Sequence, residues 1–155
     1  VGHMLPAPAI VSDVDLGRRL RNEPSVARTL AVAPRSDVLV FSPGVLEEES
    51  VLVRSGFLTE RGMERLRAMG AVTDIFSRFL DMSGEPVSQE LEERTIAIPL
   101  DAVRQAKRSV AVASSLVKAV PMLVAMRSRL ATAAVVDEEL AKEILLLGRL
   151  GAEGH

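Results

Sequence analysis

The chain has 155 residues, of which 48% are hydrophobic and 26% charged, so it can bury the core of one ordinary domain. Its net charge of −2 gives no basic footprint and argues against direct nucleic-acid binding. There is no cysteine, and the only two histidines, His3 and His155, lie at the ends, which argues against disulfides, a thiolate metal site and an internal histidine base. No apolar run approaches the roughly 18 residues of a membrane span.

The first third of the chain predicts helices and a strand. Residues 7–11 (APAIV) are expected to form a strand or an extended lead-in, because prolines confine such a run to an edge or a beginning. Asp13 caps a predicted helix that runs to about residue 33 and that Pro24 breaks in two. Residues 36–44 (SDVLVFSPG) predict a strand closed by a Pro-Gly turn.

The middle of the chain is predicted to form a loop at residues 46–57 and a helix at residues 59–70. A β-like segment at 71–81, a turn at 82–85 and a strand at 95–100 follow. Thr59 caps this helix and Gly70 stops it.

The last third is predicted to form a short helix at residues 101–108 and then a strand at 109–114, which is followed by a helix to about residue 129. A second strand at 131–136 and a closing helix at 137–150 complete the chain. Near-continuous apolar strands, each followed by a helix, indicate a parallel sheet covered by helices on both faces.

Three stretches of the sequence resemble one known family: GAVTDIFSRFLDMSGEPV, RTIAIPLDAVR and VAVASSLVKAVPMLVAMRSRLATAAVVDEELAKEIL. In order and spacing they are similar to the effector domain of SorC-type (DeoR-related) sugar-responsive transcriptional regulators. The similarity assigns residues 5–148 to a partial effector-binding domain. Residues 1–4 are then a tag remnant or lead-in, and residues 149–155 are a C-terminal tail.

The resemblance implies an α/β, Rossmann-like three-layer domain with a mostly parallel sheet, related in fold to ribose-5-phosphate isomerases and glucosamine-6-phosphate deaminases. It implies a cytoplasmic protein that binds a phosphorylated sugar or related metabolite, without a cofactor or a metal. In such regulators the effector shifts a homo-oligomer, a dimer or tetramer, and a separate N-terminal helix-turn-helix holds DNA. The similarity begins partway through the family's domain, so that the helix-turn-helix and a first strand with a Gly-Gly-Thr-like loop lie outside it.

Lys118 is the first candidate ligand contact. It follows a strand and opens a helix, where backbone N–H groups and the helix dipole favour an anion, and a lysine adds a point charge for phosphate. Ser114 and Ser115 precede it and can bond the same group. The alternative is a solvated lysine behind a serine N-cap.

Two loops depart from the family pattern. The Gly-Gly pair of the lysine loop is Ser114-Ser115 here, and Gly-Ile-Gly after the earlier strand is Ser42-Pro43-Gly44. Both changes remove glycines where the backbone would contact a ligand. Gly44 stays a candidate contact, and whether a sugar phosphate or another effector binds stays open.

Four further residues have two interpretations each. Asp81 and Arg78 either reach sugar hydroxyls or form an ion pair at a hairpin. Asp74 either contacts the ligand or hydrogen-bonds a loop, and Arg54 either pairs with an anion or braces its loop.

Two acidic groups receive structural interpretations. Asp137 and Glu138 are expected to cap the last helix. Residues 47–49, three consecutive glutamates, lie where related isomerases and deaminases place catalytic acids, but they are expected to be solvated, because the family is non-enzymatic. The rivals to an effector-binding domain are a sugar-phosphate isomerase or deaminase and a degenerate domain that only oligomerises.

Overall fold

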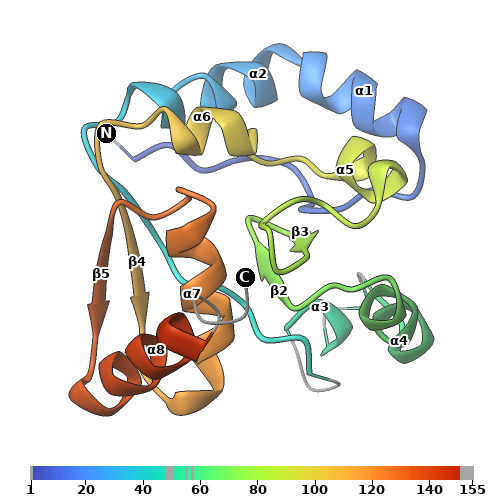
Figure 1. Cartoon of the computed structure of the whole chain (residues 1–155). Coiled ribbons are helices and arrows are strands. Elements are labelled where there is room, and N and C mark those ends of the chain that lie inside the picture. Colours follow the sequence, from blue (N-terminus) through green and yellow to red (C-terminus); the bar gives the residue numbers. More distant parts are fainter. Residues whose placement is uncertain (1, 48–50, 55, 57, 151–155) are drawn as a thin grey trace.

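The computed structural model describes residues 2–47, 51–54, 56 and 58–150. It shows a mixed α/β fold built from one parallel sheet and one β-hairpin, with helices packed between and around them (Figure 1). The predicted class, α/β with a mostly parallel sheet, is confirmed.

The parallel sheet consists of three short apolar strands: β1 (Leu39–Phe41), β4 (Ser109–Ala113) and β5 (Ala133–Val136). They lie in the order β1-β4-β5, with Val40 opposite Val110 and Val112 opposite Val135. All three strands were expected from the sequence, although β1 is much shorter than its predicted segment. Because the strands are parallel, their carboxyl ends meet at one edge of the sheet.

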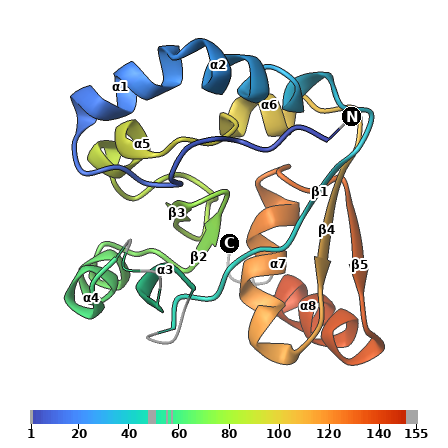
Figure 2. The same ribbon diagram turned by 180° about the vertical axis from the view of Figure 1, so that it is seen from behind.

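Two helices cover one face of this sheet: α7 (Ala119–Arg127) and α8 (Glu138–Leu150). Helix α7 packs against β4 and β5, and α8 packs against α7 on the same side (Figures 1 and 2). The main core lies around α7, and its buried cluster includes Met122 of α7, Ala111 of the sheet and Ile75 of the hairpin. Helix α8 ends at Leu150, inside the predicted tail, and the rest of that tail lies outside the described residues.

The hairpin consists of β2 (Thr73–Ile75) and β3 (Arg78–Leu80), which pair antiparallel on the side of α7 away from the sheet. Its two turn residues, Phe76 and Ser77, have φ angles of 52° and 61°. The ring of Phe76 lies 5.1 Å from that of Phe41 in β1. The β-like segment predicted for residues 71–81 is therefore this hairpin.

The two predicted amino-terminal helices are present as α1 (Val14–Asn22) and α2 (Pro24–Leu30). Asp13 Oδ1 accepts a hydrogen bond from the Leu16 N–H at 2.8 Å, so the predicted cap and the break at Pro24 are both confirmed. The remaining elements are four helices and two 3₁₀ turns: α3 (Val51–Arg54), α4 (Glu60–Ala68), α5 (Gln89–Arg94), α6 (Leu100–Arg104), η1 (Ala33–Arg35) and η2 (Leu116–Lys118). Thr59 caps α4 through the Gly62 N–H, also as predicted. None of the described helices is both long and apolar enough to cross a membrane.

The strand predicted for residues 95–100 is wrong, and residues 7–11 form a lead-in segment, which was the alternative to a strand there. The two segments share an isolated bridge between Ile10 and Thr95, and Leu100 already begins α6. The physical reason is the prolines within both runs, Pro8 and Pro99, because a residue without an N–H cannot continue a ladder.

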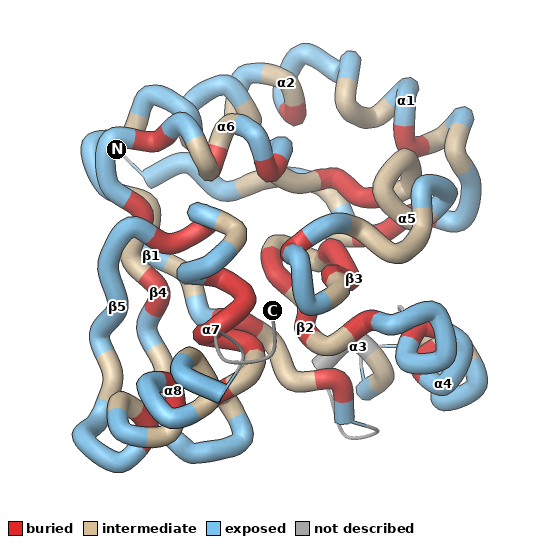
Figure 3. Tube along the Cα trace, in the orientation of Figure 1, coloured by how far each residue is buried: buried red, intermediate tan, exposed pale blue. Residues whose placement is uncertain are grey.

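The expected cover on both faces of the sheet is also not found in the described part of the chain. The face opposite α7 carries Val40, Val112 and Val135, whose exposed fractions are 66%, 38% and 57%. We call these three side chains the valine face. No described element lies over them in either view, and the tube of β5 is largely exposed (Figures 1, 2 and 3).

Candidate functional site

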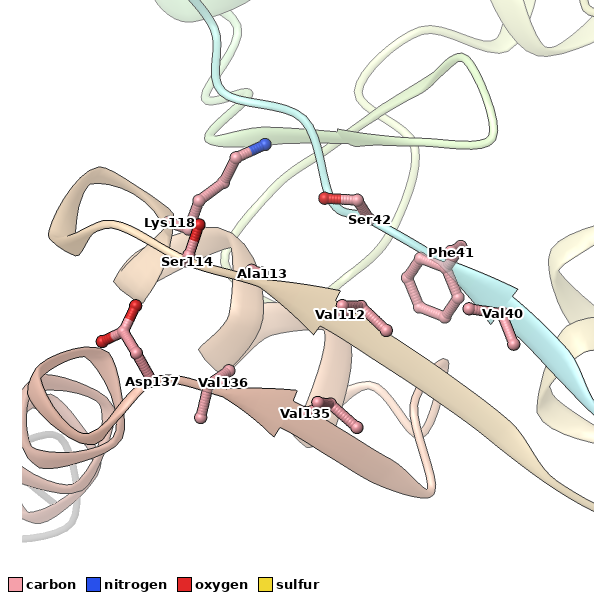
Figure 4. A pocket seen from close by; sticks show the side chains of 10 residues that line it. All are labelled: Val40, Phe41, Ser42, Val112, Ala113, Ser114, Lys118, Val135, Val136 and Asp137. Atoms are coloured by element: carbon pink, nitrogen blue, oxygen red, sulfur yellow. The ribbon is translucent and has the colours of Figure 1, made fainter.

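A cavity of about 690 Å³ opens at the carboxyl edge of the parallel sheet. It is lined by the strand ends and by the residues that follow them: Val40, Phe41, Ser42, Val112, Ala113, Ser114, Lys118, Val135, Val136 and Asp137 (Figure 4). Ligands of open α/β sheets bind at this kind of edge, in cavities of comparable size. One side of the cavity is therefore polar and the other is the valine face.

Lys118 supplies the positive charge among these lining residues. It ends η2 and directly precedes α7, and its side chain extends toward the chain that leaves β1 (Figure 4). Its Nζ donates a hydrogen bond to the carbonyl oxygen of Pro43. A lysine ammonium has three donors, so two remain for water or a ligand. This hydrogen bond thus holds Lys118 at the cavity and leaves donors of its ammonium group for a ligand.

The serine loop before Lys118 keeps a backbone shape that suits glycine. Ser115 has φ 83° and ψ 136°, which L-residues rarely adopt. Its N–H donates to Asp137 Oδ2 at 3.2 Å, and its carbonyl accepts from the Lys118 N–H at 3.1 Å. The loop therefore offers a ligand fewer free N–H groups than predicted, because the N–H groups of Ser115 and Lys118 are already hydrogen-bonded within the protein. Ser114 lines the cavity, and Ser115 shapes the loop.

Asp137 connects this loop to α8. Its Oδ1 accepts from the Leu140 N–H at 2.8 Å, so the predicted capping role is confirmed. The same carboxylate holds Ser115, and the pKa of Asp137 lies below its usual value because of these two backbone bonds, that to Leu140 first.

Gly44 and Asp74 join β1 to the hairpin behind Lys118. The Gly44 N–H donates to the Asp74 carbonyl at 2.7 Å, and the Thr73 hydroxyl donates to the Gly44 carbonyl at 2.8 Å. Burial raises the pKa of Asp74 to about 6, and the charge of Lys118 acts in the opposite direction. The loop of residues 42–44 is thus fixed both by the hairpin and by Lys118.

Of the predicted ligand residues, Lys118 and Ser114 line the cavity, while Ser115 and Gly44 belong to the loops that form its edge. Arg54 is exposed at the end of α3 and does not line it. The carbonyl of Leu46, in the loop that Arg54 was considered to brace, is bonded by Arg67 instead.

Arg78 and Asp81 lie outside the cavity and have internal partners. Arg78 is buried, with Nε 2.7 Å from Glu92 Oε1 and Nη1 2.8 Å from the carbonyl of Ile98. Asp81 Oδ1 accepts from the hydroxyl and N–H of Ser83, and chiefly this hydroxyl lowers its pKa. Both side chains have structural roles, and the hairpin ion pair that was considered joins Arg78 to Glu92 rather than to Asp81.

Sequence reasoning missed Ser42 and the valines as cavity residues. The signal was present, because outward positions alternate along β1 and β4 and no polar residue interrupts them. Of the predicted acidic run, Glu47 is exposed, and Glu48 and Glu49 lie outside the described residues. Within the described residues, no group of three or more His, Cys, Asp and Glu side chains is placed to hold a metal ion.

An α/β fold with a mostly apolar cavity and a lysine at its edge is typical of a small-molecule-binding domain. The family model described as "Putative sugar-binding domain" matches residues 2–146, and the chain therefore belongs to that family.

Comparison with known proteins gives transcriptional regulators and domains of such regulators. The chain is 31% identical over 147 residues to the transcriptional regulator LsrR of Enterobacter sp., covering 93% of this chain and 46% of that protein. The solved structure described as "Putative Sugar-Binding Domain of Transcriptional Repressor" from Vibrio fischeri is similar, with a TM-score of 0.83, 26% identity and coverage of 94% of this chain and 58% of that one. The structure described as "a domain of a possible sugar-binding transcriptional regulator" from Arthrobacter aurescens has a TM-score of 0.80 and 26% identity, and the match covers 91% of this chain and 54% of that one.

The homologues are thus DeoR-, LsrR- and SorC-type transcriptional regulators, which confirms the resemblance drawn from the sequence. The chain spans about half the length of the curated relatives it matches.

Proposed function

We propose that this chain is the effector-binding part of a bacterial transcriptional regulator and that its effector is a phosphorylated sugar or a related anionic metabolite. The observation that supports this most directly is the position of Lys118, whose ammonium lies at the cavity edge between the loop after β1 and the serine loop after β4. Membership of the sugar-binding family supports the sugar part of the proposal.

The polar edge of the cavity suits a phosphate group bound to an apolar-walled pocket. Lys118 would contribute a point charge, and the Ser42 and Ser114 side chains, which also line the cavity, would donate hydrogen bonds to phosphate oxygens. Asp74 lies close enough to Lys118 for the two charges to interact, and the lysine charge lowers the pKa of Asp74 against the larger effect of burial.

Regulation would follow from differential affinity. An effector shifts an equilibrium between two oligomeric arrangements only by the difference in its affinity for them. DNA would be held by a separate helix-turn-helix domain, and the protein would act in the cytoplasm with its operator.

The proposed function is non-enzymatic, in line with the names of its relatives. The isomerase or deaminase alternative would require turnover of ribose-5-phosphate or glucosamine-6-phosphate that depends on Glu47 to Glu49. Such turnover, abolished by replacing these glutamates, would overturn the proposal.

A thermal-shift screen of sugar phosphates against the corresponding free sugars tests the binding site. A ligand that binds only the folded state raises the melting temperature, and this rise should disappear in Lys118→Ala. Lys107→Ala is the matched control, because Lys107 is an exposed lysine paired with Asp37 and does not line the cavity. A rise that survives in Lys118→Ala removes Lys118 from the site, and the absence of any stabilising compound favours the domain that only oligomerises.

A further inference from the structure

A second cavity lies between α4 and α5, on the side of the hairpin away from α7 (Figures 1 and 2). Its volume is about 210 Å³. It shares no described lining residue with the cavity at Lys118. The backbones of α4 and α5 are not in close contact, so the space between them is lined by side chains from both helices.

The inner walls of this second cavity are apolar. Leu66 is buried in a core cluster separate from the one around α7, and Leu58 and Leu91 pack against that cluster. Met69 also lines the cavity and has an exposed fraction of 53%. Apolar surface at the cavity thus stays in contact with water, and a ligand that covered it would gain free energy from its burial.

Two arginines of the cavity have unused hydrogen-bond donors. Arg94 Nε donates to the carbonyl of Val11 at 2.7 Å, and its Nη1 donates to Glu90 Oε1 at 3.2 Å. These bonds fix the guanidinium, while its Nη2 has no acceptor among the described residues. Arg65 is exposed on α4, and its side chain forms no hydrogen bond or ion pair with any described residue. A guanidinium presents donors in a planar fork that matches a carboxylate.

The charge of the lining selects the kind of anion. Arg65 and Arg94 contribute two positive charges and Glu90 one negative charge, which gives a net charge of +1. A monoanion balances this charge, whereas a phosphate dianion would also face the Glu90 carboxylate. Ser88 supplies one further donor, because its Oγ accepts from the Leu91 N–H at 3.3 Å and its hydroxyl hydrogen stays free. The apolar walls offer no partners for the many hydroxyls of a sugar.

We propose that this second cavity binds a small monocarboxylic acid with an apolar body. The carboxylate is bound by Arg65 and Arg94, and the hydrocarbon part covers Leu66 and Met69. The cavity is smaller than the roughly 300–1,000 Å³ of pockets for drug-sized ligands, so the acid is smaller than such ligands. This site is separate from the proposed effector site at Lys118 and does not depend on it.

Methyl NMR of the chain tests the site through its methionines. Met69 lines the cavity, whereas Met82 and Met126, with exposed fractions of 48% and 44%, do not and serve as internal controls. The probe is hexanoate. Acetate provides the charge without the apolar body, and hexan-1-ol provides the apolar body without the charge. We expect hexanoate to shift the Met69 methyl signal with a Kd of about 1 mM, and the other two compounds to bind at least about tenfold more weakly.

Two substitutions of Arg65 separate its charge from any effect on folding. Arg65→Ala removes a guanidinium without an internal partner, so it should hardly change the melting temperature and should weaken hexanoate binding at least about tenfold. Arg65→Glu gives the lining a net charge of −1, so that hexylamine rather than hexanoate should shift the Met69 signal. Arg61→Ala is the matched control, because Arg61 is exposed on the same helix and does not line the cavity.

A Met69 signal that hexanoate does not shift would overturn the proposal. An equal response to hexan-1-ol, or a response to hexanoate that persists in Arg65→Ala, would also overturn it, because the cavity would then bind apolar molecules without recognising a carboxylate. Equal shifts at Met82 and Met126 would show non-specific association and would have the same consequence. Met69 lies outside the Lys118 cavity, so failure of the effector screen and failure of this proposal are separate results.

Discussion

The carboxylate of Asp74 occupies the space that a β-carbon on residue 44 would fill. A Cβ built on Gly44 would lie 1.5 Å from Asp74 Oδ1 and 2.5 Å from its Cγ. The two residues are also joined through their backbones, so the carboxylate cannot move away without disturbing the bridge between β1 and the hairpin. Gly44 is therefore required by close packing, although the other glycine of the family's motif is Ser42 here.

Replacing Gly44 by alanine should lower the free energy of unfolding by about 2 kcal/mol, because overpacking forces side chains and backbone apart. Urea denaturation measures this. Gly148→Ala is the control, since the nearest atom to its new Cβ is 3.9 Å away and the residue lies within α8. That variant should gain about 0.5–1 kcal/mol from helix propensity. A Gly44→Ala protein as stable as the original would contradict the packing explanation.

Asp74 should make the protein less stable as pH rises from about 4 to above 6. Its pKa is raised from 3.8 to about 6 by burial, so the folded state holds a proton that the unfolded state has released. The stability that this proton provides is complete below the unfolded pKa and lost as pH rises through the folded one. Asp74→Asn should flatten this part of the profile and be more stable than the original at pH 7.5, by about 1–3 kcal/mol.

Urea denaturation at a series of pH values checks the Asp74 prediction. Asp137→Asn is the control, because the pKa of Asp137 is lowered and its titration falls below this window. An unchanged slope between pH 5 and 7 in Asp74→Asn would show that another group carries the dependence.

Ser115→Gly should stabilise the protein by about 0.5–1 kcal/mol. Residue 115 has φ 83°, where glycine has no steric penalty and serine does. Ser114→Gly is the matched control, because residue 114 is not among the residues with positive φ, and there glycine only adds unfolded-state freedom. The melting temperatures of the two variants should therefore shift in opposite directions. Equal decreases in melting temperature would show that the hydroxyl of Ser115 contributes more to stability than the strain of its backbone.

Arg78→Ala should lower the free energy of unfolding by about 3–5 kcal/mol even without a ligand, because it leaves Glu92 partly buried and unpaired. Arg78→Met combined with Glu92→Leu should recover much of this loss, since no charge then stays unpaired. Arg18→Ala breaks an exposed pair with Asp15 and should change the stability by less than about 0.5 kcal/mol. An Arg78→Ala protein of normal stability that has lost effector binding would restore Arg78 as a ligand residue.

Local signals in the sequence predicted what depends on local interactions. Asp13 and Thr59 cap helices because their side chains bond N–H groups three residues away, and Pro24 opens α2 because it lacks an N–H. The extended runs around Ile10 and Thr95 have the same apolar pattern as the true strands. The local signal that separates them from the strands is a proline within each run, Pro8 and Pro99.

The site was predictable only in part, for the same physical reason. Lys118 was found through the resemblance and the strand-to-helix position, both of which are read along the chain. The contact of Gly44 with Asp74 joins residues 30 positions apart, and no local pattern encodes it. The burial of Arg78 depends on Glu92 and on the carbonyl of Ile98, which are distant in sequence, so no local pattern encodes these contacts either.

The turn of the hairpin has a consequence for how the protein unfolds. Phe76 and Ser77 both have left-handed backbones without being glycine or asparagine, which costs about 1 kcal/mol or more each. Local preference thus opposes the turn, and the contact of Phe76 with Phe41 helps to maintain it. Since Phe41 belongs to β1, the stability of the hairpin depends on the parallel sheet. The parallel sheet and the hairpin should therefore lose their amide protection together in hydrogen exchange, as a single cooperative unit.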